Sequence, residues 1–550
     1  MLQNKFKRID TWVMLSGLIY VLLPILIFLL KFTRPYFFLA GLVLFLYLIF
    51  RFITTIDDST GFTNDDILNK KSLTFLIATL IIFCIWIYFS GIGSFSFQNW
   101  DFWVRNPIYN DLISKPWPLY YNLGEQNEYV RGLIGGEWVA FAYYFTFWLT
   151  PASLCKVMNL SGLSCQLVLY LYSLVGIIII NYLLCRLYKK FSWKITAILM
   201  AFSGLDVVAY IIHNLALPSL TEELEWSLEY YQLSGNTTQI YYVFNQSIPI
   251  WIIMLLILNI NSSRLIAAIS ALCFAYSPWA TIGLVPIAVT GLYSDSRIKI
   301  AEAKASSENK GIISCVVKNI CSICNICIPV FMLLIFGLYY SASGGSDGGH
   351  GLYYFTTDAT VSEYIIGFII FALTEFILYY LAVGKSIFSY RYSLIVFIEL
   401  LIFPLYYVVD FNFFIRGTIP ALFLLMVILI SYLLDITPEG MTLISDESTS
   451  SLELHENNAI NNTHVQNNNI LIRKRILTGL LVVGALTSVI TFTRSAIKTY
   501  EGGNILQSDI STFDDLSTAN EYQVLTTNSQ FFVHGFATKP FYLFISKLGL

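Results

Sequence analysis

Long apolar runs recur along this 550-residue chain and constrain its fold more than any other feature. A helix needs about 17–25 apolar residues to cross the roughly 30 Å hydrocarbon core of a bilayer. Thirteen candidate runs lie near residues 11–31, 36–53, 72–91, 167–187, 195–212, 246–260, 262–277, 279–293, 322–341, 364–384, 391–409, 417–435 and 476–493. We therefore expect an all-α integral membrane protein with about 13 transmembrane helices.

The composition excludes several classes of protein. Hydrophobic residues make up 56% of the chain and charged residues 12%, whereas soluble proteins average about 45–50% and about 25%. The net charge of −3 leaves no basic surface for nucleic acid. The nine cysteines do not suggest a disulfide framework, because most lie in apolar stretches. An ordinary cytosolic enzyme, a nucleic-acid binder and a disordered scaffold are thus excluded.

The distribution of basic residues predicts the orientation of the chain. With a cytosolic N-terminus and thirteen crossings, most of the 32 Lys and Arg residues fall in cytosolic segments and the C-terminus is outside. The regions expected outside are 92–166, 213–245, 342–363 and 494–550. The chain then divides into an N-terminal helix pair with a cytosolic loop at 1–71, a core of helices and outer loops at 72–435, an Asn-rich cytosolic loop of low complexity at 436–475, and a last helix with an outer tail at 476–550.

Two stretches depart from this simple pattern. Residues 134–151 are apolar but carry Glu137, and a crossing here would move the basic cluster at 186–194 outside. We therefore expect an amphipathic aromatic helix on the outer interface, within a large first outer loop that contains amphipathic helices. The runs between 246 and 293 are short and contain three prolines, so we expect some of them to be tilted or half-crossing.

The first outer loop contains a candidate catalytic acid. Asp101 lies between Trp100 and Trp103, where a carboxylate could take a proton from an acceptor hydroxyl. The planar fork of Arg105 could bind a phosphate. The alternative is that Asp101 caps a helix while the tryptophans anchor the chain at the interface.

The second outer region is acidic. Asp206 lies within a predicted helix near its outer end, where an acid needs a partner. The loop that follows has four glutamates and no Lys or Arg. With Glu225, Trp226 and nearby amides it could bind a sugar, a cation or a peptide acceptor. The alternative is a solvated acidic loop.

Further charged residues lie near or within later helices. Arg416, at the start of a helix on the outer side, could hold a lipid phosphate together with the helix N-terminal amides. A salt bridge to Asp410 is at least an equal alternative. Glu375 and Glu399 lie within predicted spans, and neither alone indicates proton transport.

No metal site is predicted. Asp347 and His350 in a glycine-rich loop provide only two candidate ligands. Cys321, Cys324 and Cys327 run along one helical face, where we expect them to pack as small apolar residues. The sequence contains no phosphate-binding loop, Gly-x-Ser-x-Gly, His-Glu-x-x-His or dinucleotide fingerprint.

Several blocks of sequence stand out together over most of residues 95–545. They are Trp100-Asp101 with Asn106, Asn110-Asp111-Leu112-Ile113, Trp117-Pro118 with Tyr120, Trp148-Leu149-Thr150-Pro151-Ala152, Phe202-Ser203-Gly204-Leu205-Asp206, Phe244-Asn245-Gln246-Ser247-Ile248-Pro249, Ser277-Pro278-Trp279, Asn412-Phe413, Arg416-Gly417 and Phe541-Tyr542-Leu543-Phe544. These blocks resemble a family of poorly characterised polytopic membrane proteins, which is itself similar to the GT-C superfamily of glycosyltransferases.

The resemblance implies inverting transfer of a sugar from a polyprenyl-phosphate donor to an unknown acceptor on the outer side of a bilayer. Asp101 matches the acid of the superfamily's first outer loop and would act as general base, with Asp111 in the same site. Arg416, or a divalent cation, would stabilise the departing phosphate, and no other cofactor is implied. The flanking Trp100 and Phe102 depart from the paired acids that are frequent there, and two extra helices precede the usual core. A bacterial cytoplasmic membrane fits the resemblance best.

Other classes of function are consistent with the sequence. A transporter or lipid flippase would use Asp206, Glu375 and Glu399 as charge relays within the bundle. Large outer loops and the lack of two inverted halves count against it. A non-catalytic membrane partner would depend on its packing surfaces instead. A polysaccharide polymerase or ligase would also use a lipid-linked sugar and would differ in its acceptor.

Overall fold

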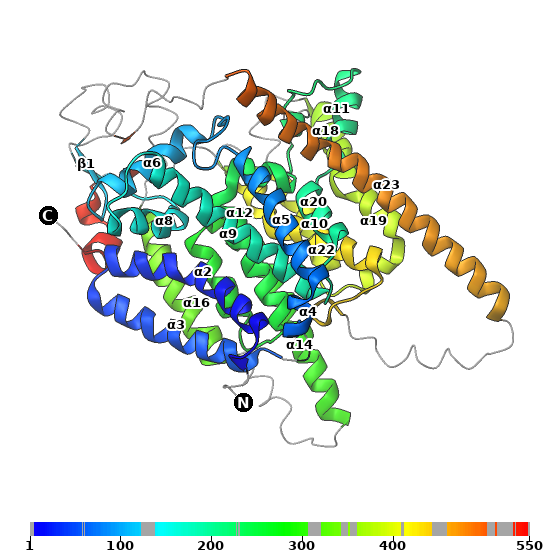
Figure 1. Cartoon of the computed structure of the whole chain (residues 1–550), viewed down its shortest axis with the longest axis horizontal. Coiled ribbons are helices and arrows are strands. Elements are labelled where there is room, and N and C mark those ends of the chain that lie inside the picture. Colours follow the sequence, from blue (N-terminus) through cyan, green and yellow to red (C-terminus); the bar gives the residue numbers. More distant parts are fainter. Residues whose placement is uncertain are drawn as a thin grey trace.

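The computed structural model describes most of the chain as one helical bundle (Figure 1). The described residues are 5–57, 59, 61–122, 138–226, 228, 231–305, 321–342, 350–352, 360–408, 412–442, 459–502, 512–513, 532–533 and 535–547.

The elements of the first half are α2 (Ile9–Phe32), α3 (Pro35–Thr55), α4 (Asn64–Leu68), α5 (Lys70–Tyr88), α6 (Phe102–Ser114), β1 (Tyr120–Asn122), β2 (Trp138–Phe141), α8 (Thr146–Val157), α9 (Leu163–Leu187), α10 (Trp193–Ala201), α11 (Asp206–Asn214), η1 (Leu224–Trp226), α12 (Asn236–Ile260), α13 (Ile266–Ala271) and η2 (Leu272–Ala275). Those of the second half are α14 (Pro278–Ala305), α16 (Ile323–Met332), η3 (Leu333–Gly337), α17 (Leu338–Ala342), β3 (His350–Leu352), α18 (Val361–Ala372), η5 (Leu373–Ile377), α19 (Leu378–Val383), η6 (Gly384–Ser389), α20 (Ser393–Ile402), η7 (Phe403–Leu405), β4 (Tyr406–Val408), α21 (Asn412–Gly417), α22 (Ile419–Leu434), η8 (Glu439–Met441), α23 (Ala459–Tyr500), β5 (Phe532–Val533), η11 (Phe536–Thr538) and η12 (Phe541–Ile545).

Within the described residues, nine helices are long and apolar enough to cross a membrane. They comprise α2, α3, α5, α9, α10 with α11, α12, α16 with α17, α18 with α19, and the apolar part of α23. Three shorter apolar helices, Ile266–Ala275, Ser393–Leu405 and Ile419–Leu434, coincide with three more predicted runs, and the run at 279–293 lies in α14. The all-α membrane class is confirmed, whereas thirteen crossings stay a prediction.

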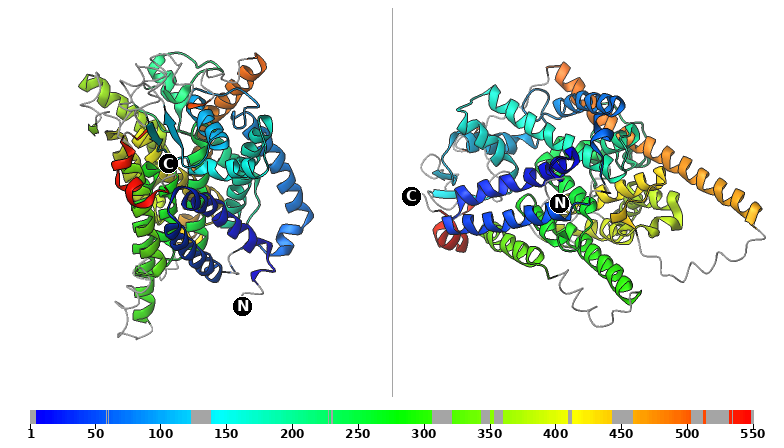
Figure 2. Two further views of the ribbon diagram at one scale, coloured as in Figure 1. Left: turned by 90° about the vertical axis from the view of Figure 1, so that its left-hand side faces the viewer. Right: turned by 60° about the horizontal axis from the view of Figure 1, so that its bottom comes forward.

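Helices α12 and α22 form the centre of the bundle. Nearly every residue of both helices is buried, and α12 packs against α2, α9 and α22. A helix that is apolar on all sides is stable only where other helices surround it. The first part of α23 and the last part of α14 project from the bundle instead (Figure 2).

Helix α12 begins earlier than the sequence predicts. Residues 236–245 were expected in an outer loop, but they form its first turns and are almost all buried. Their polar side chains bind carbonyls in the last turn of α10: Asn236 Nδ2 donates to the Leu199 carbonyl at 2.8 Å, and Thr237 Oγ1 to the Met200 carbonyl at 2.7 Å. Because helix C-terminal carbonyls lack partners within their own helix, this polar segment is drawn into the bundle rather than into water.

The first outer region also differs from its prediction. Residues 138–141 form strand β2, and α8 begins only at Thr146, so the single helix expected over 134–151 is wrong for its described part. Strand β2 pairs with β1 on one side and with β5 of the C-terminal tail on the other. The backbone groups of β2 are thus satisfied by segments distant in the sequence, which the local apolar pattern could not reveal.

The ends of α2 contact segments predicted on opposite sides of the membrane. Near its start, Lys5 Nζ donates to the Ile56 carbonyl at 2.5 Å, and both were predicted to be cytosolic. Just after its end, the Arg34 amide donates to the Ile545 carbonyl at 2.8 Å, and both were predicted outside. The two ends of α2 thus contact different parts of the chain, as a crossing by α2 requires.

A buried ion pair joins α2 and α9. Arg186 Nε donates to Asp10 Oδ1 at 3.0 Å, and both side chains are 1% exposed. Tyr182 donates to the same carboxylate at 3.0 Å, and Arg186 Nη1 donates to Asn259 of α12 at 2.9 Å. Gly61 lies so close that a Cβ there would be 2.0 Å from Asp10 Oδ2. Three helices are thus connected through one pair of opposite charges.

We expect Asp10→Ala to lower the free energy of unfolding by roughly 3–5 kcal/mol, because it leaves the Arg186 guanidinium buried without a counter-charge. Melting in detergent is the measurement, with the exposed Asp65→Asn as control. The double variant Asp10→Ala/Arg186→Met should recover most of the loss. Equal melting temperatures for Asp10→Ala and the control would contradict this assignment.

Candidate functional site

Asp101 immediately precedes α6 but does not cap it. Its side chain makes no capping hydrogen bond. Instead, Arg105 Nη2, one helical turn later, donates to Asp101 Oδ2 at 2.6 Å. The carboxylate is 35% exposed and the arginine side chain 8%. The capping alternative is therefore excluded, and Asp101 presents a partly accessible carboxylate at the end of the bundle.

Arg105 is a buried cation, and one of its hydrogen-bond donor groups is unused by the described residues. Its guanidinium lies 5.6 Å from the ring centroids of both Phe102 and Phe244. Among the described residues, its Nη1 has no hydrogen-bond partner. Burial lowers the pKa of Arg105, and the charge of Arg416 acts in the same direction, while Asp101 opposes the shift. Arginine nevertheless stays protonated in proteins, so Nη1 can donate to an anionic ligand.

Arg416 brings a second guanidinium to this place from α21. It lies 5.8 Å from the ring centroid of Tyr144 and interacts electrostatically with Asp101. Its Nε is buried and has no partner within the described part of the chain. Asp410, the alternative partner expected from the sequence, lies outside the described residues. Among the described residues, two arginines therefore lie near one carboxylate, one in an ion pair and one within electrostatic range.

Helix α12 contacts this site next to its kink. Val243 has non-helical φ and ψ angles of −134° and 34°, and the next residue, Phe244, supplies one of the rings against Arg105. Asn245 and Gln246 follow, each 1% exposed. Within the described structure, both polar side-chain atoms of Asn245 and Oε1 of Gln246 lack partners. Such buried groups cost about 1–3 kcal/mol each unless a ligand or water satisfies them.

Helix α23 adds residues to this end of the bundle that sequence reasoning missed. Arg494 forms an ion pair with Glu223 and donates to Tyr242 Oη at 3.0 Å. Tyr242 in turn lies within electrostatic range of Asp101. Arg494 directly follows the last predicted apolar run. The sequence could not indicate its partners, because Tyr242 and Glu223 lie some 250 residues earlier in the chain.

Asp111 lies near the other end of α6. Ten residues separate it from Asp101, which corresponds to about 15 Å along a helix. Asp111 is fully buried and accepts hydrogen bonds from Tyr121 Oη at 2.7 Å and from the Phe513 amide at 3.0 Å. The structure therefore does not bring the two predicted catalytic acids together, and Asp111 joins the C-terminal tail to the first outer region.

Three buried acids form a separate cluster. Asp206, at the start of α11, accepts from Ser203 Oγ at 2.9 Å, and its carboxyl is hydrogen bonded to that of Glu375 in the π-helical turn η5. Glu225 lies within electrostatic range of both and accepts from the Gly235 amide at 2.8 Å. The sequence predicted Asp206 and Glu225 as site residues, and the structure unites them with Glu375 rather than with Asp101.

The remaining candidates contribute less to either site. The Trp226 side chain lies outside the described residues, as do Asp347 and the side chain of His350. Cys324 is buried, whereas Cys321 and Cys327 are exposed. The described residues contain no group of three His, Cys, Asp or Glu side chains that could hold a metal ion. One carboxylate beside two arginines does not fit a divalent cation, so the arginines themselves supply the positive charge here.

No protein-family model matches the chain, and comparisons with curated proteins and with solved structures also give no match. The fold defines a polytopic α-helical membrane protein, and the site gathers one carboxylate and two arginines at one end of its bundle.

The buried Glu225 predicts a pH-dependent stability. Burial raises its pKa to about 8, with the charge of Asp206 acting in the same direction. Because the pKa in the folded protein exceeds the unfolded value of about 4.3, the protonated Glu225 carboxyl stabilises the fold. This contribution to the free energy of unfolding is complete below about pH 4 and is lost as the pH rises through about 8. The melting temperature should fall over this range, and Glu225→Gln should flatten the fall. The partly exposed Glu222→Gln is the control, and the same slope in both variants would argue against the assignment.

Proposed function

We propose that this protein is a membrane glycosyltransferase of GT-C type that moves a sugar from a polyprenyl-phosphate donor to an acceptor on the outer side of the membrane. One observation carries the proposal: a partly exposed carboxylate, Asp101, lies near the buried guanidinium of Arg105 and the half-buried guanidinium of Arg416, each with one buried donor that no described residue uses. A base beside a phosphate-binding arrangement is what such a transfer requires.

The surroundings of the site support a lipid-linked, phosphorylated donor. Arginine forks match phosphate oxygens and are strengthened where aromatic rings exclude water, as Phe244 and Tyr144 do here. Asn245 and Gln246 offer donors and acceptors of the kind that sugar hydroxyls use. The polyprenyl chain would lie in the surrounding bilayer.

The proposed reaction is a single displacement. The acceptor hydroxyl oxygen attacks the anomeric carbon while Asp101 takes its proton. The bond between the anomeric carbon and the phosphate oxygen breaks, and both its electrons leave with the polyprenyl phosphate. Arg105 and Arg416 stabilise the negative charge that develops on this leaving group, and the configuration of the sugar inverts.

We further propose a multi-pass protein of the cell membrane, with the bacterial cytoplasmic membrane favoured, the N-terminus in the cytosol and the C-terminus outside. The clustering of Lys194, Lys474 and Arg475 around one cavity supports this orientation, because basic residues concentrate on the cytosolic side. Asp101 lies just after α5 and would then face outward, where a lipid-linked donor and its acceptor meet.

Replacing the base should abolish turnover. Asp101→Asn should lower kcat by about 100-fold or more, since general-base catalysis contributes roughly 10²–10⁴. The measurement is sugar release or transfer from a panel of labelled polyprenyl-phosphate hexoses and pentoses, with purified protein and with or without a divalent cation.

Glu222→Gln, in the second outer region, should retain the wild-type rate and serves as control. A fully active, folded Asp101→Asn protein would exclude Asp101 as the base while leaving the class of enzyme intact. Failure of the wild type with every donor would count against the glycosyltransferase itself.

Changes at Arg416 should act on the phosphate. Arg416→Gln should raise KM for the donor and lower kcat together, by about 100-fold in kcat/KM, because losing one preorganised donor to a developing charge costs about 10²–10³ in rate. Arg416→Lys keeps the charge but loses the fork, so its effect should be intermediate. Lys539→Gln in the tail is the control. An unchanged KM and kcat for Arg416→Gln would remove this residue from the site.

A transporter or lipid flippase is the second candidate, and the Asp206–Glu375 pair favours it. The two carboxyl groups interact with one another within the bundle, and paired acids inside a membrane span can take up and release protons. This alternative expects function to be lost in Asp206→Asn and kept in Asp101→Asn. The glycosyltransferase proposal expects the reverse order of sensitivity.

A further inference from the structure

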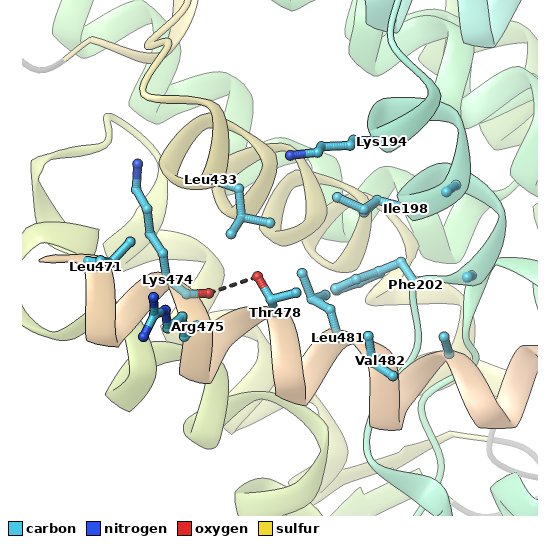
Figure 3. A pocket seen from close by; sticks show the side chains of 13 residues that line it. Lys194, Ile198, Phe202, Leu433, Leu471, Lys474, Arg475, Thr478, Leu481 and Val482 are labelled. Atoms are coloured by element: carbon cyan, nitrogen blue, oxygen red, sulfur yellow. Dashed lines mark hydrogen bonds between the residues drawn. The ribbon is translucent and has the colours of Figure 1, made fainter.

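A cavity of about 680 Å³ opens between α10, α22 and α23 (Figure 3). Most of its wall is apolar. The apolar side chains that the argument uses are Ile198, Phe202, Leu433, Leu481 and Val482. Thr478 also lines it, but its hydroxyl donates to the Lys474 carbonyl at 2.8 Å, so it presents no unsatisfied donor to the cavity.

Three basic side chains line the same cavity: Lys194 from the first turn of α10, and Lys474 and Arg475 from α23. Figure 3 shows Lys474 and Arg475 toward one end and Phe202 and Val482 toward the other. Lys474 pairs with Asp435. Among the described residues, no ion pair involves Lys194 or Arg475. The cavity lining therefore has two positive charges available to an anion, one from α10 and one from α23.

The dimensions match one leaflet of a bilayer. Ten residues separate Arg475 from Ala485 at the far end of the lining, which gives about 15 Å at 1.5 Å per residue. This is half of the roughly 30 Å hydrocarbon core. A lipid with its phosphate at Arg475 would thus reach the bilayer midplane at Ala485.

We propose that this cavity binds an anionic phospholipid of the cytosolic leaflet. Its headgroup phosphate lies between Lys194 and Arg475, and one acyl chain follows α23 past Leu481 and Val482. The charge of the site is complementary to anionic headgroups, which attract nearby basic residues. The chain-length match distinguishes a lipid from a soluble anion, which would leave the apolar wall uncovered.

The lipid also explains how α23 is held against the bundle. This helix is among the least buried candidate spans, because only 28% of its apolar stretch is buried. Its close approach is at Gly484, where a Cβ would lie 2.8 Å from the Ser203 carbonyl. A bound acyl chain extends this contact toward the basic end, by filling the space between α23 and α10.

The test is native mass spectrometry of the full chain with equimolar phosphatidylglycerol and phosphatidylcholine. Wild type should retain phosphatidylglycerol preferentially. Lys194→Gln/Arg475→Gln should weaken this binding by roughly fivefold for each neutralised side chain. Val482→Trp, at a position 62% exposed, should weaken binding of the same lipid by filling the groove without changing charge. The control is Lys70→Gln/Lys71→Gln, which removes two exposed charges predicted on the same side of the membrane.

Selective loss of phosphatidylglycerol in both groove variants, with the control like wild type, supports the proposal. Equal loss in the control overturns it in favour of general surface charge. Loss in the charge variant but not in Val482→Trp overturns the acyl-chain site. Equal retention of the two lipids by wild type, or a dimer that Val482→Trp dissociates, overturns it in favour of another occupant.

Discussion

A charged side chain within a bilayer is costly unless it has a partner or a ligand, and this constraint organises the bundle. Asp10 and Arg186 neutralise one another between α2 and α9, and the arginine reaches on to Asn259 of α12. Elsewhere the pairing is incomplete. Among the described residues, Arg105 and Arg416 lie near the single carboxylate of Asp101, beside buried aromatic rings. Since unpaired buried charge is costly, we propose that an anionic ligand compensates them.

Helix α12 lies near both candidate sites, the one around Asp101 and the buried acid cluster around Asp206. Its first turn binds the carbonyls that end α10, close to the place where α11 begins with Asp206. Its kink at Val243 places Phe244 beneath Arg105. Helix α12 therefore contacts Arg105 through Phe244, and the Gly235 amide directly before it donates to Glu225 of the buried acid cluster.

The sequence predicted the class of fold because apolar length is a local property. Each of the thirteen predicted runs overlaps a helix, although the run at 391–409 ends in strand β4, and the predicted site residue Arg105 does contact Asp101. Local pattern could not show that residues 236–245 are helical, because their burial depends on carbonyls from α10. It could not separate Asp111 from Asp101 either, since the partner of Asp111 is Phe513 of the tail. The acid pair Asp206–Glu375 joins residues far apart in the chain, and only packing reveals it.

An experimental structure with a non-transferable polyprenyl-phosphate sugar analogue would test the central claim most directly. Our account predicts phosphate density between the guanidinium groups of Arg105 and Arg416, with the anomeric carbon on the side of Asp101 and the sugar near Asn245 and Gln246. Density for the analogue at the Asp206–Glu375 pair, with the arginines unoccupied at saturating concentration, would contradict the account and favour a transport function.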